Sequence, residues 1–295
     1  MTFTSRCPLL PGAKRPRPVL LLVLAALTTW AVAPEAGSQT APIGLRPPTT
    51  YPADASAAPA PFGPGERLVY RVKVGILSAG EGEMSVAGLD TVRGNDAYLI
   101  NMTIQGGIPG ARVKDAYSSW LDIRTLQSWR FVQDIHQVRY RSFRHFEMHP
   151  ERQLWVRKDN DESGPLASAL PLDDIAFIYF LRTIPLEVGK TYTFDRYFKA
   201  EGNPVVVTVL RRDRRRTDAG DFPTLVLQPT IQTRGIFHGG RAEIHLTDDA
   251  RRIPVYVKSD IPRFPGSLTL HLKEIHPGVP LHPESRARVA AAGRP

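Results

Sequence analysis

The segment Arg67-Leu-Val-Tyr-Arg-Val-Lys-Val74 gives the clearest indication of the fold class. Within it, the apolar residues Leu68, Tyr70, Val72 and Val74 alternate with positions that are mostly basic. Successive side chains of a strand point to opposite faces, so this period of two predicts a β-strand with one buried and one solvated face. Such a strand needs neighbours, and the chain on its C-terminal side supplies them.

Further strand-like runs follow at a spacing of about ten residues, separated by Gly, Pro, Asn or Asp. They cover residues 83–92, 96–105, 112–123, 127–135, 137–148, 152–158, 191–200, 204–212, 222–231, 241–247, 253–259 and 267–275. The glycine-rich segment 75–82 is expected to turn the chain between the first two strands. Strands and helices do not alternate along the chain, which argues against a doubly wound nucleotide-binding fold.

One segment, residues 172–182, breaks the strand pattern. It contains no turn residue, and Asp173 and Asp174 stand where the start of a helix favours acids. Its apolar residues surround the helix almost completely, so the helix must be buried, plugging or capping the open end of a barrel. We therefore expect an all-β fold, a curled antiparallel β-barrel-like sheet with one buried helix.

The N-terminal residues 1–38 are typical of a signal peptide. Basic residues precede the apolar run 19–33, which at about fifteen residues is shorter than the roughly 20 that a membrane span requires. Cleavage after Ser38 would make the protein periplasmic or secreted; a retained single-pass anchor is the alternative. Cys7 precedes the apolar run, so it cannot be the lipidated cysteine of a lipoprotein.

The remaining chain divides into three parts. Residues 39–64 are rich in Pro and Ala and are predicted to be a flexible linker. Residues 65–276 contain the strand pattern and form the predicted domain. Residues 277–295 resemble the linker in composition and are predicted to be a disordered tail.

Composition excludes several classes of protein. The chain has 295 residues, of which 42% are hydrophobic, so it is not disordered throughout. Its single Cys excludes an intramolecular disulfide framework, a cysteine-based metal site and, once the signal is removed, a catalytic thiol. The net charge is +9, but the export signal and the absence of interleaved aromatic residues argue against a nucleic-acid partner.

Motifs for catalysis are largely absent. The sequence has no Gly-x-Ser-x-Gly elbow, no His-Glu-x-x-His and no phosphate-binding glycine loop. On a strand, His145, Glu147 and His149 would share one face at a spacing that suits zinc, but Arg139 and Arg141 precede them on that face and oppose a cation. We expect no metal site and no cofactor.

A run of five arginines and one aspartate at 211–216 is the strongest local charge. Such a run could grip the phosphates of a lipid or lipopolysaccharide-like ligand. The alternative is a solvated hairpin tip between two strands, and the sequence favours this second interpretation.

Several of these motifs resemble a known family. Gly65-Glu-Arg-Leu-Val-Tyr70, Gly75-Ile-Leu-Ser-Ala-Gly80 and Thr247-Asp-Asp-Ala-Arg-Arg-Ile-Pro-Val255 are similar to the bacterial envelope family named domain of unknown function 3108, DUF3108. The resemblance implies an exported, β-rich protein with a barrel-like sheet, no established enzymatic activity and no catalytic residues. Within its turn motif we expect mainly structural roles for five residues: Asp248, Asp249, Arg251, Arg252 and Pro254.

Three functions remain open after the sequence. The first is a non-enzymatic envelope protein that binds an apolar or amphipathic ligand, or an envelope partner, with Phe177, Tyr179 and Phe180 of the buried helix as ligand contacts. The second is an envelope hydrolase or metal-dependent enzyme, and the third is a structural or assembly protein. The partners expected are a lipid or lipopolysaccharide-like ligand or an envelope protein, with peripheral membrane contact.

Overall fold

The computed structural model describes residues 49–50, 60–108, 111–137, 140–230, 242–260 and 267–281. The predicted signal peptide at 1–38 lies outside the described residues, as do most of the predicted linker at 39–64 and tail at 277–295. The inner ends of linker and tail are described, and they belong to the packed domain. Ala60 and Phe62 are each only 1% exposed, and the backbone N–H of Val279 donates to the carbonyl of Pro64.

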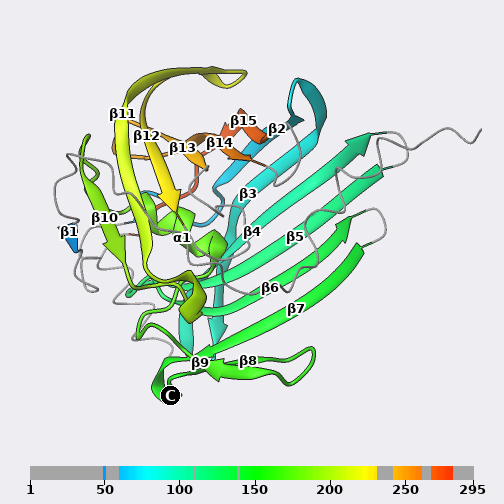
Figure 1. Cartoon of the computed structure of the whole chain (residues 1–295), viewed down its shortest axis with the longest axis vertical. Coiled ribbons are helices and arrows are strands. Elements are labelled where there is room, and N and C mark those ends of the chain that lie inside the picture. The colour runs from blue at the N-terminus through cyan, green and yellow to red at the C-terminus, as the bar shows by residue number, and fades with distance from the viewer. Residues whose placement is uncertain are drawn as a thin grey trace, which may run out of the picture.

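In the described part of the chain, fifteen strands form one sheet, and one α-helix and two short 3-10 helices lie in its connections (Figure 1). In chain order the elements are β1 (Thr49–Thr50), β2 (Arg67–Val74), β3 (Leu77–Val92), β4 (Asn95–Ile108), β5 (Ala111–Asp122), β6 (Ser128–Gln137), β7 (Tyr140–His149), η2 (Pro150–Arg152), β8 (Leu154–Arg157), β9 (Ser163–Pro165), α1 (Asp174–Leu181), β10 (Thr191–Phe194), η3 (Ala200–Gly202), β11 (Val205–Thr217), β12 (Gly220–Thr230), β13 (Glu243–Thr247), β14 (Pro254–Asp260) and β15 (Ser267–His276).

The strand order is β1-β10-β11-β12-β13-β14-β15-β2-β3-β4-β5-β6-β7-β8-β9. Every neighbouring pair is antiparallel except β1 and β10, which are parallel. On β2, Leu68, Tyr70 and Val72 are buried, as the alternation predicted, and Arg71 and Lys73 point to the other face. The predicted fold class is confirmed.

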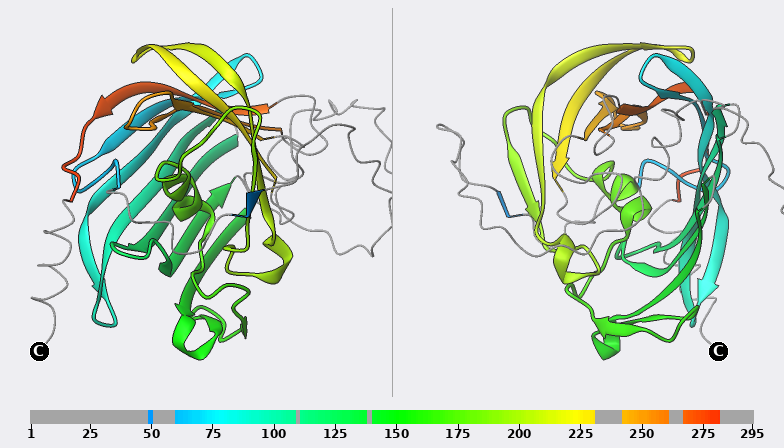
Figure 2. Two further views of the ribbon diagram at one scale, coloured as in Figure 1. Left: turned by 90° about the vertical axis from the view of Figure 1, so that its left-hand side faces the viewer. Right: turned by 45° about the vertical axis from the view of Figure 1, so that its right-hand side comes forward.

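The curled sheet brings its two ends together without pairing β9 to β10 as strands (Figure 2). The chain on either side of α1 bridges them instead. The N–H of Leu172 donates to the carbonyl of Arg196 at 2.5 Å, the N–H of Phe198 donates back to Leu172 at 3.1 Å, and Ala167 donates to Phe198 at 3.1 Å. This seam gives the open sheet its barrel-like shape.

Helix α1 lies inside the curl, and every residue from Ile175 to Leu181 is buried. Its N-cap is Asp173, whose carboxylate accepts hydrogen bonds from the N–H groups of Ile175 and Ala176, both at 2.9 Å. The predicted helix at 172–182 therefore begins two residues too early, because Leu172 is bridged to Tyr197 in the seam. Burial all round was predicted correctly.

Three local expectations were wrong. Residues 75–82 are not a long turn, because β3 starts at Leu77 and only Gly75 and Ile76 turn the chain. Gly80 lies in the strand at a bulge, and an added Cβ there would meet the carbonyl of Gln105 at 2.1 Å. The strand predicted at 191–200 stops at Phe194, since the next residues form the seam. The arginine run at 211–216 lies within β11 and not between strands.

Candidate functional site

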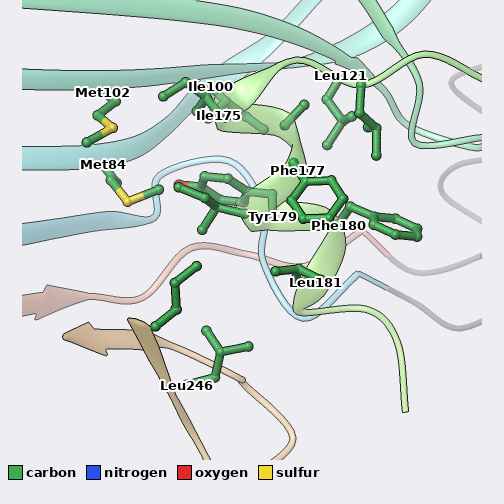
Figure 3. Packing of buried hydrophobic residues seen from close by; sticks show 14 of the residues in the cluster. Met84, Ile100, Met102, Leu121, Ile175, Phe177, Tyr179, Phe180, Leu181 and Leu246 are labelled. Atoms are coloured by element: carbon green, nitrogen blue, oxygen red, sulfur yellow. The ribbon is translucent and has the colours of Figure 1, made fainter. Parts of the chain in front are cut away.

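The register of β4 to β7 defines an inner face, which carries Ser119 and meets α1. Ile100, Ser119, Phe131 and Phe146 lie opposite one another across these four strands, and none is more than 4% exposed. The hydroxyl of Ser119 donates to the carboxylate of Asp173 at 2.6 Å, which fixes the helix to this row. Figure 3 shows side chains of the sheet, among them Met84, Met102 and Leu121, around the helix.

Phe177, Tyr179 and Phe180, the predicted ligand contacts, are packed against other aromatic side chains. The rings of Phe177 and Phe180 lie 5.9 and 5.3 Å from that of Phe194, and the ring of Tyr179 lies edge-on to Phe62 at 4.9 Å. All three helix residues are at most 3% exposed. They fill the interior of the curled sheet around α1, and their contact with a ligand stays a prediction.

Farther from α1 the same face becomes more open and more polar. We call this part the distal inner face. Its residues share the side-chain parity of Ser119 along β4 to β7: Ile104, Val113, Asp115, Tyr117, Gln133, Ile135, Gln137, Tyr140, Ser142 and Arg144. Asp115 and Gln137 are buried, and the others are partly buried.

Two buried polar side chains, Asp115 and Gln137, lie on the distal inner face. Asp115 accepts hydrogen bonds from the side chain of Gln137 at 2.6 Å and from the N–H of His136 at 3.1 Å. Burial nevertheless raises the pKa of Asp115 above its usual range. The side-chain oxygen of Gln137 is buried and accepts no hydrogen bond from the described residues. Burial and the nearby carboxylate of Asp115 likewise raise the pKa of Tyr117.

Asp174 lies where α1 meets this face. Burial, reinforced by the neighbouring Asp173, raises the pKa of Asp174 to about 7. The hydroxyl of Tyr197 donates to it at 3.2 Å. The ammonium of Lys199, nearby, lies over the rings of Trp155, Phe146 and Phe198 at 4.3, 4.7 and 5.5 Å.

Two of the motifs singled out in the sequence meet at the C-terminal end of α1. Glu66 accepts two hydrogen bonds from Arg182, at 2.6 and 2.8 Å, and Arg182 also donates to the carbonyl of Arg251. The hydroxyl of Tyr70 donates to the carbonyl of Pro254 at 2.8 Å. Burial lowers and Glu66 raises the pKa of Arg182, and the net shift is upward.

Sequence reasoning missed the pairing of Glu66 with Arg182. The available signals were a cation at the end of an apolar helix and the acid of the Gly-Glu motif. No spacing rule links residues that lie 116 positions apart.

The turn motif is held by one carboxylate. Oδ1 of Asp249 accepts from the hydroxyl of Thr247 at 2.6 Å and from the N–H groups of Arg251 and Arg252 at 3.0 and 3.2 Å. Burial opposes these bonds, but together with the Arg251 guanidinium they lower the pKa of Asp249. Arg252 adopts a positive φ of 49° to complete the turn. Asp248 accepts from Nε of Arg212 at 2.8 Å.

A pocket of about 110 Å³ lies beside this cluster, lined by Pro61, Glu66, Arg251, Ile253, Ile275, Pro277, Gly278 and Pro280. None of its lining residues comes from α1. The predicted ligand contacts Phe177, Tyr179 and Phe180 therefore do not line this pocket. It belongs to the junction between the N- and C-terminal segments.

The candidate metal ligands His145, Glu147 and His149 form hydrogen bonds and ion pairs with protein side chains. Glu147 accepts from Nε of Arg130 at 2.5 Å, is paired with Arg93, and lies 2.9 Å from Nε2 of His145. His149 is paired with Glu151 instead. Among the described residues, no group of three or more His, Cys, Asp or Glu side chains is arranged to hold a metal ion.

Four arginines of the run in β11 also have partners. Arg211 pairs with Asp213, Arg212 with Asp248, Arg214 with Asp221, and Arg215 with His245 and Glu243. The run is thus largely an ion-paired strand surface. Within the described ranges, no helix is long and apolar enough to cross a membrane.

Comparison with known proteins identifies a family and finds similar solved structures. The family described as "Protein of unknown function (DUF3108)" matches residues 69–273. The chain is similar to a β-barrel-like protein of domain of unknown function DUF1849 from Brucella abortus, with 10% identity, a TM-score of 0.48, and coverage of 74% of this chain and 99% of that one. It is also similar to a candidate exported protein with a YmcC-like fold from Bacteroides fragilis. The identity is 8%, the TM-score is 0.27, and the match covers 74% of this chain and 98% of that one. No curated protein matches the sequence.

Proposed function

The chain belongs to the DUF3108 family, and on that premise we propose that it is an exported, non-enzymatic protein that binds an amphipathic ligand inside its curled sheet. The observation that carries the proposal is the distal inner face. There the curl continues beyond the helix that fills its floor, and most of the lining side chains remain partly exposed.

The chemistry of this face selects the class of ligand. Ile104, Val113 and Ile135 offer apolar contact, which favours a hydrocarbon chain or another apolar body. Arg144 and Gln133 lie opposite each other on neighbouring strands and supply hydrogen-bond donors for a polar head group. A lipid-like molecule with one polar end satisfies both.

Export rests on the sequence of residues 1–38. A lipid-like ligand is compatible with a location in the envelope, because an exported protein encounters lipids there. The metal-dependent alternative loses the residues it relied on, since the Glu147 carboxylate is bound by two guanidinium groups.

Native mass spectrometry of the protein purified from its own envelope tests the proposal. We expect an additional bound mass that lipid extraction removes. Ile135→Asn places an amide in the apolar part of the face, and its occupancy should fall about tenfold, the equivalent of 1.4 kcal/mol.

Val132→Asn is the matched control. Val132 is also partly buried on β6, but it lies on the opposite face of the sheet, so this variant should keep the ligand. Absence of any bound mass in the unaltered protein would refute the proposal. Equal losses in the two variants would place the ligand elsewhere.

A further inference from the structure

The tip of the β2–β3 hairpin exposes two adjacent apolar side chains. Ile76 is 95% exposed and Leu77 is 59% exposed. Gly75, at φ +59°, and Ile76 form a two-residue turn between Val74 and Leu77. Turns of this kind usually carry Gly, Asn or Asp, so an isoleucine that projects into solvent contradicts the ordinary turn chemistry.

This tip belongs to one end of the sheet, which we call the rim. In an antiparallel meander alternate turns lie at the same end, so the strand ends at Val74, Gln137 and Tyr140 all lie at the rim. Figure 1 shows the ends of β2 to β7 on the upper right, away from α1. The distal inner face runs toward this same end.

Cations accompany the apolar tip on the outer face of the rim. They are Lys73, Arg112, Lys114 and Arg141, and the last three are exposed. Within the described part of the chain, none of these four forms an ion pair. The contrast with cations farther from the rim is clear, since Arg67 pairs with Glu83, Arg71 with Asp218 and Lys273 with Glu81.

The electrostatics of the neighbouring strands agree with a positive rim. His271 lies on β15 beside Arg71, on the outer face. Burial lowers the pKa of His271 to about 4, and Lys73, Arg215 and Arg71 reinforce that shift while Asp218 opposes it.

We propose that the rim docks peripherally on an anionic lipid surface, with Ile76 and Leu77 in the interface and Lys73, Arg112, Lys114 and Arg141 against the head groups. Apolar side chains that project beside unpaired cations are the combination that such a surface recognises. A protein partner would leave the four like charges without partners unless it were acidic at matching positions. Docked in this way, the distal inner face opens toward the membrane, and this orientation rests on the proposed ligand function.

Co-sedimentation of the purified chain with vesicles tests the docking. Vesicles of phosphatidylethanolamine with phosphatidylglycerol should bind the protein, vesicles of phosphatidylcholine should bind it at least about tenfold less, and added salt should weaken binding. The double variant Ile76→Asp/Leu77→Asp should lose about tenfold or more of the binding, with an unchanged unfolding temperature.

Leu89→Asp is the matched control, because Leu89 is an exposed leucine on the same strand at the end away from the rim. It should bind vesicles like the unaltered chain. Failure to bind anionic vesicles, equal binding to neutral ones, or an equal loss in Leu89→Asp would each overturn the docking.

The ligand readout separates this proposal from the previous one. The Ile76→Asp/Leu77→Asp protein should still carry the mass detected by native spectrometry, because its distal inner face is unchanged. Vesicle binding by a chain that carries no ligand would support the rim and refute only the ligand function.

Discussion

At the scale of single residues, the pairing of Glu66 with Arg182 is the interaction whose loss should cost most. The side chain of Arg182 is fully buried and lies 5.1 and 5.2 Å from the rings of Phe62 and Tyr179. Removing the cation leaves the Glu66 carboxylate uncompensated in the interior. Arg182→Met should therefore lower the free energy of unfolding by about 3–5 kcal/mol, measured by urea denaturation.

Lys273→Met provides the comparison, because Lys273 and Glu81 pair on the surface with side chains 38% and 60% exposed. That variant should lose much less unfolding free energy than Arg182→Met, because an exposed ion pair gains little over solvation of its two charges by water. Equal losses of unfolding free energy in the two variants would show that the buried Glu66–Arg182 pair matters no more for stability than an exposed pair.

Asp174 should make stability depend on pH. Its folded pKa of about 7 lies above the ordinary value of 3.8, so its contribution is complete below the lower value and is lost as the pH rises through the higher one. The neighbouring carboxyl of Asp173 raises this pKa and the nearby cation Lys199 lowers it, while Tyr117, whose own pKa is raised, stays neutral over the range tested. Between about pH 5 and pH 8, the Asp174→Asn protein should gain about 1–2 kcal/mol of unfolding free energy relative to the unaltered chain.

The comparison of the two chains cancels the histidines, whose titration they share. A constant difference across that range would mean that Asp174 is already ionised at the lower pH and contributes no slope.

At the scale of elements, the packing of α1 distinguishes two roles. The helix either packs only against other protein side chains or contacts a bound ligand. Phe177 and Phe180 contact Phe194, and the guanidinium of Arg196 lies 4.5 Å from the Phe180 ring. Because these contacts are with protein side chains, Phe177→Ala and Phe180→Ala should each lower the unfolding free energy by about 3–5 kcal/mol.

Phe143→Ala, at a ring that is 54% exposed on β7, should change stability by less than about 1 kcal/mol in the same denaturation experiment. If the helix variants instead lost the bound mass with little loss of stability, Phe177 and Phe180 would line the ligand site after all.

The elements were predictable where local chemistry decides them. The alternation of Leu68, Tyr70 and Val72 predicted the strand and its buried face, and the acids and apolar residues around Asp173 predicted the helix and its burial. Sequence could not place the end of β10, because the seam that replaces the strand after Phe194 depends on hydrogen bonds to residues 167–172. The close approach of Gly80 to Gln105 could not be predicted for a similar reason, since Gln105 lies on the neighbouring strand.

The candidate site shows the same division. Its strands were predicted, but the distal inner face depends on cross-strand register, which brings Tyr117 beside Gln133 and Asp115 beside Ile135. No spacing along the chain encodes that register. The rim was even harder to predict from the sequence, because the exposure of Ile76 depends on the exact position of the two-residue turn.

At the scale of the whole molecule, the N- and C-terminal segments of the domain close on each other. Gly63 and Gly278 lie in backbone contact, so that a Cβ on Gly278 would meet the carbonyl oxygen of Gly63 at 2.2 Å and the nitrogen of Glu66 at 2.6 Å. Phe62, buried against Tyr98 and Tyr179, is the apolar end of this junction. The domain therefore extends beyond the predicted limits of 65 and 276.

This junction predicts that a protein of residues 60–281 is more stable than one of residues 65–276. The shorter chain lacks Phe62, and removal of a buried phenylalanine side chain costs about 3–5 kcal/mol.

In the full chain, Gly278→Ala should be strongly destabilising, because the added methyl group meets backbone atoms that cannot move aside independently. Gly88→Ala is the control, since nothing lies within 4 Å of a Cβ at that position. Thermal and urea unfolding of the four proteins test the junction. If 65–276 were as stable as 60–281 and Gly278→Ala as harmless as Gly88→Ala, the contact between the two segments would contribute nothing to the fold.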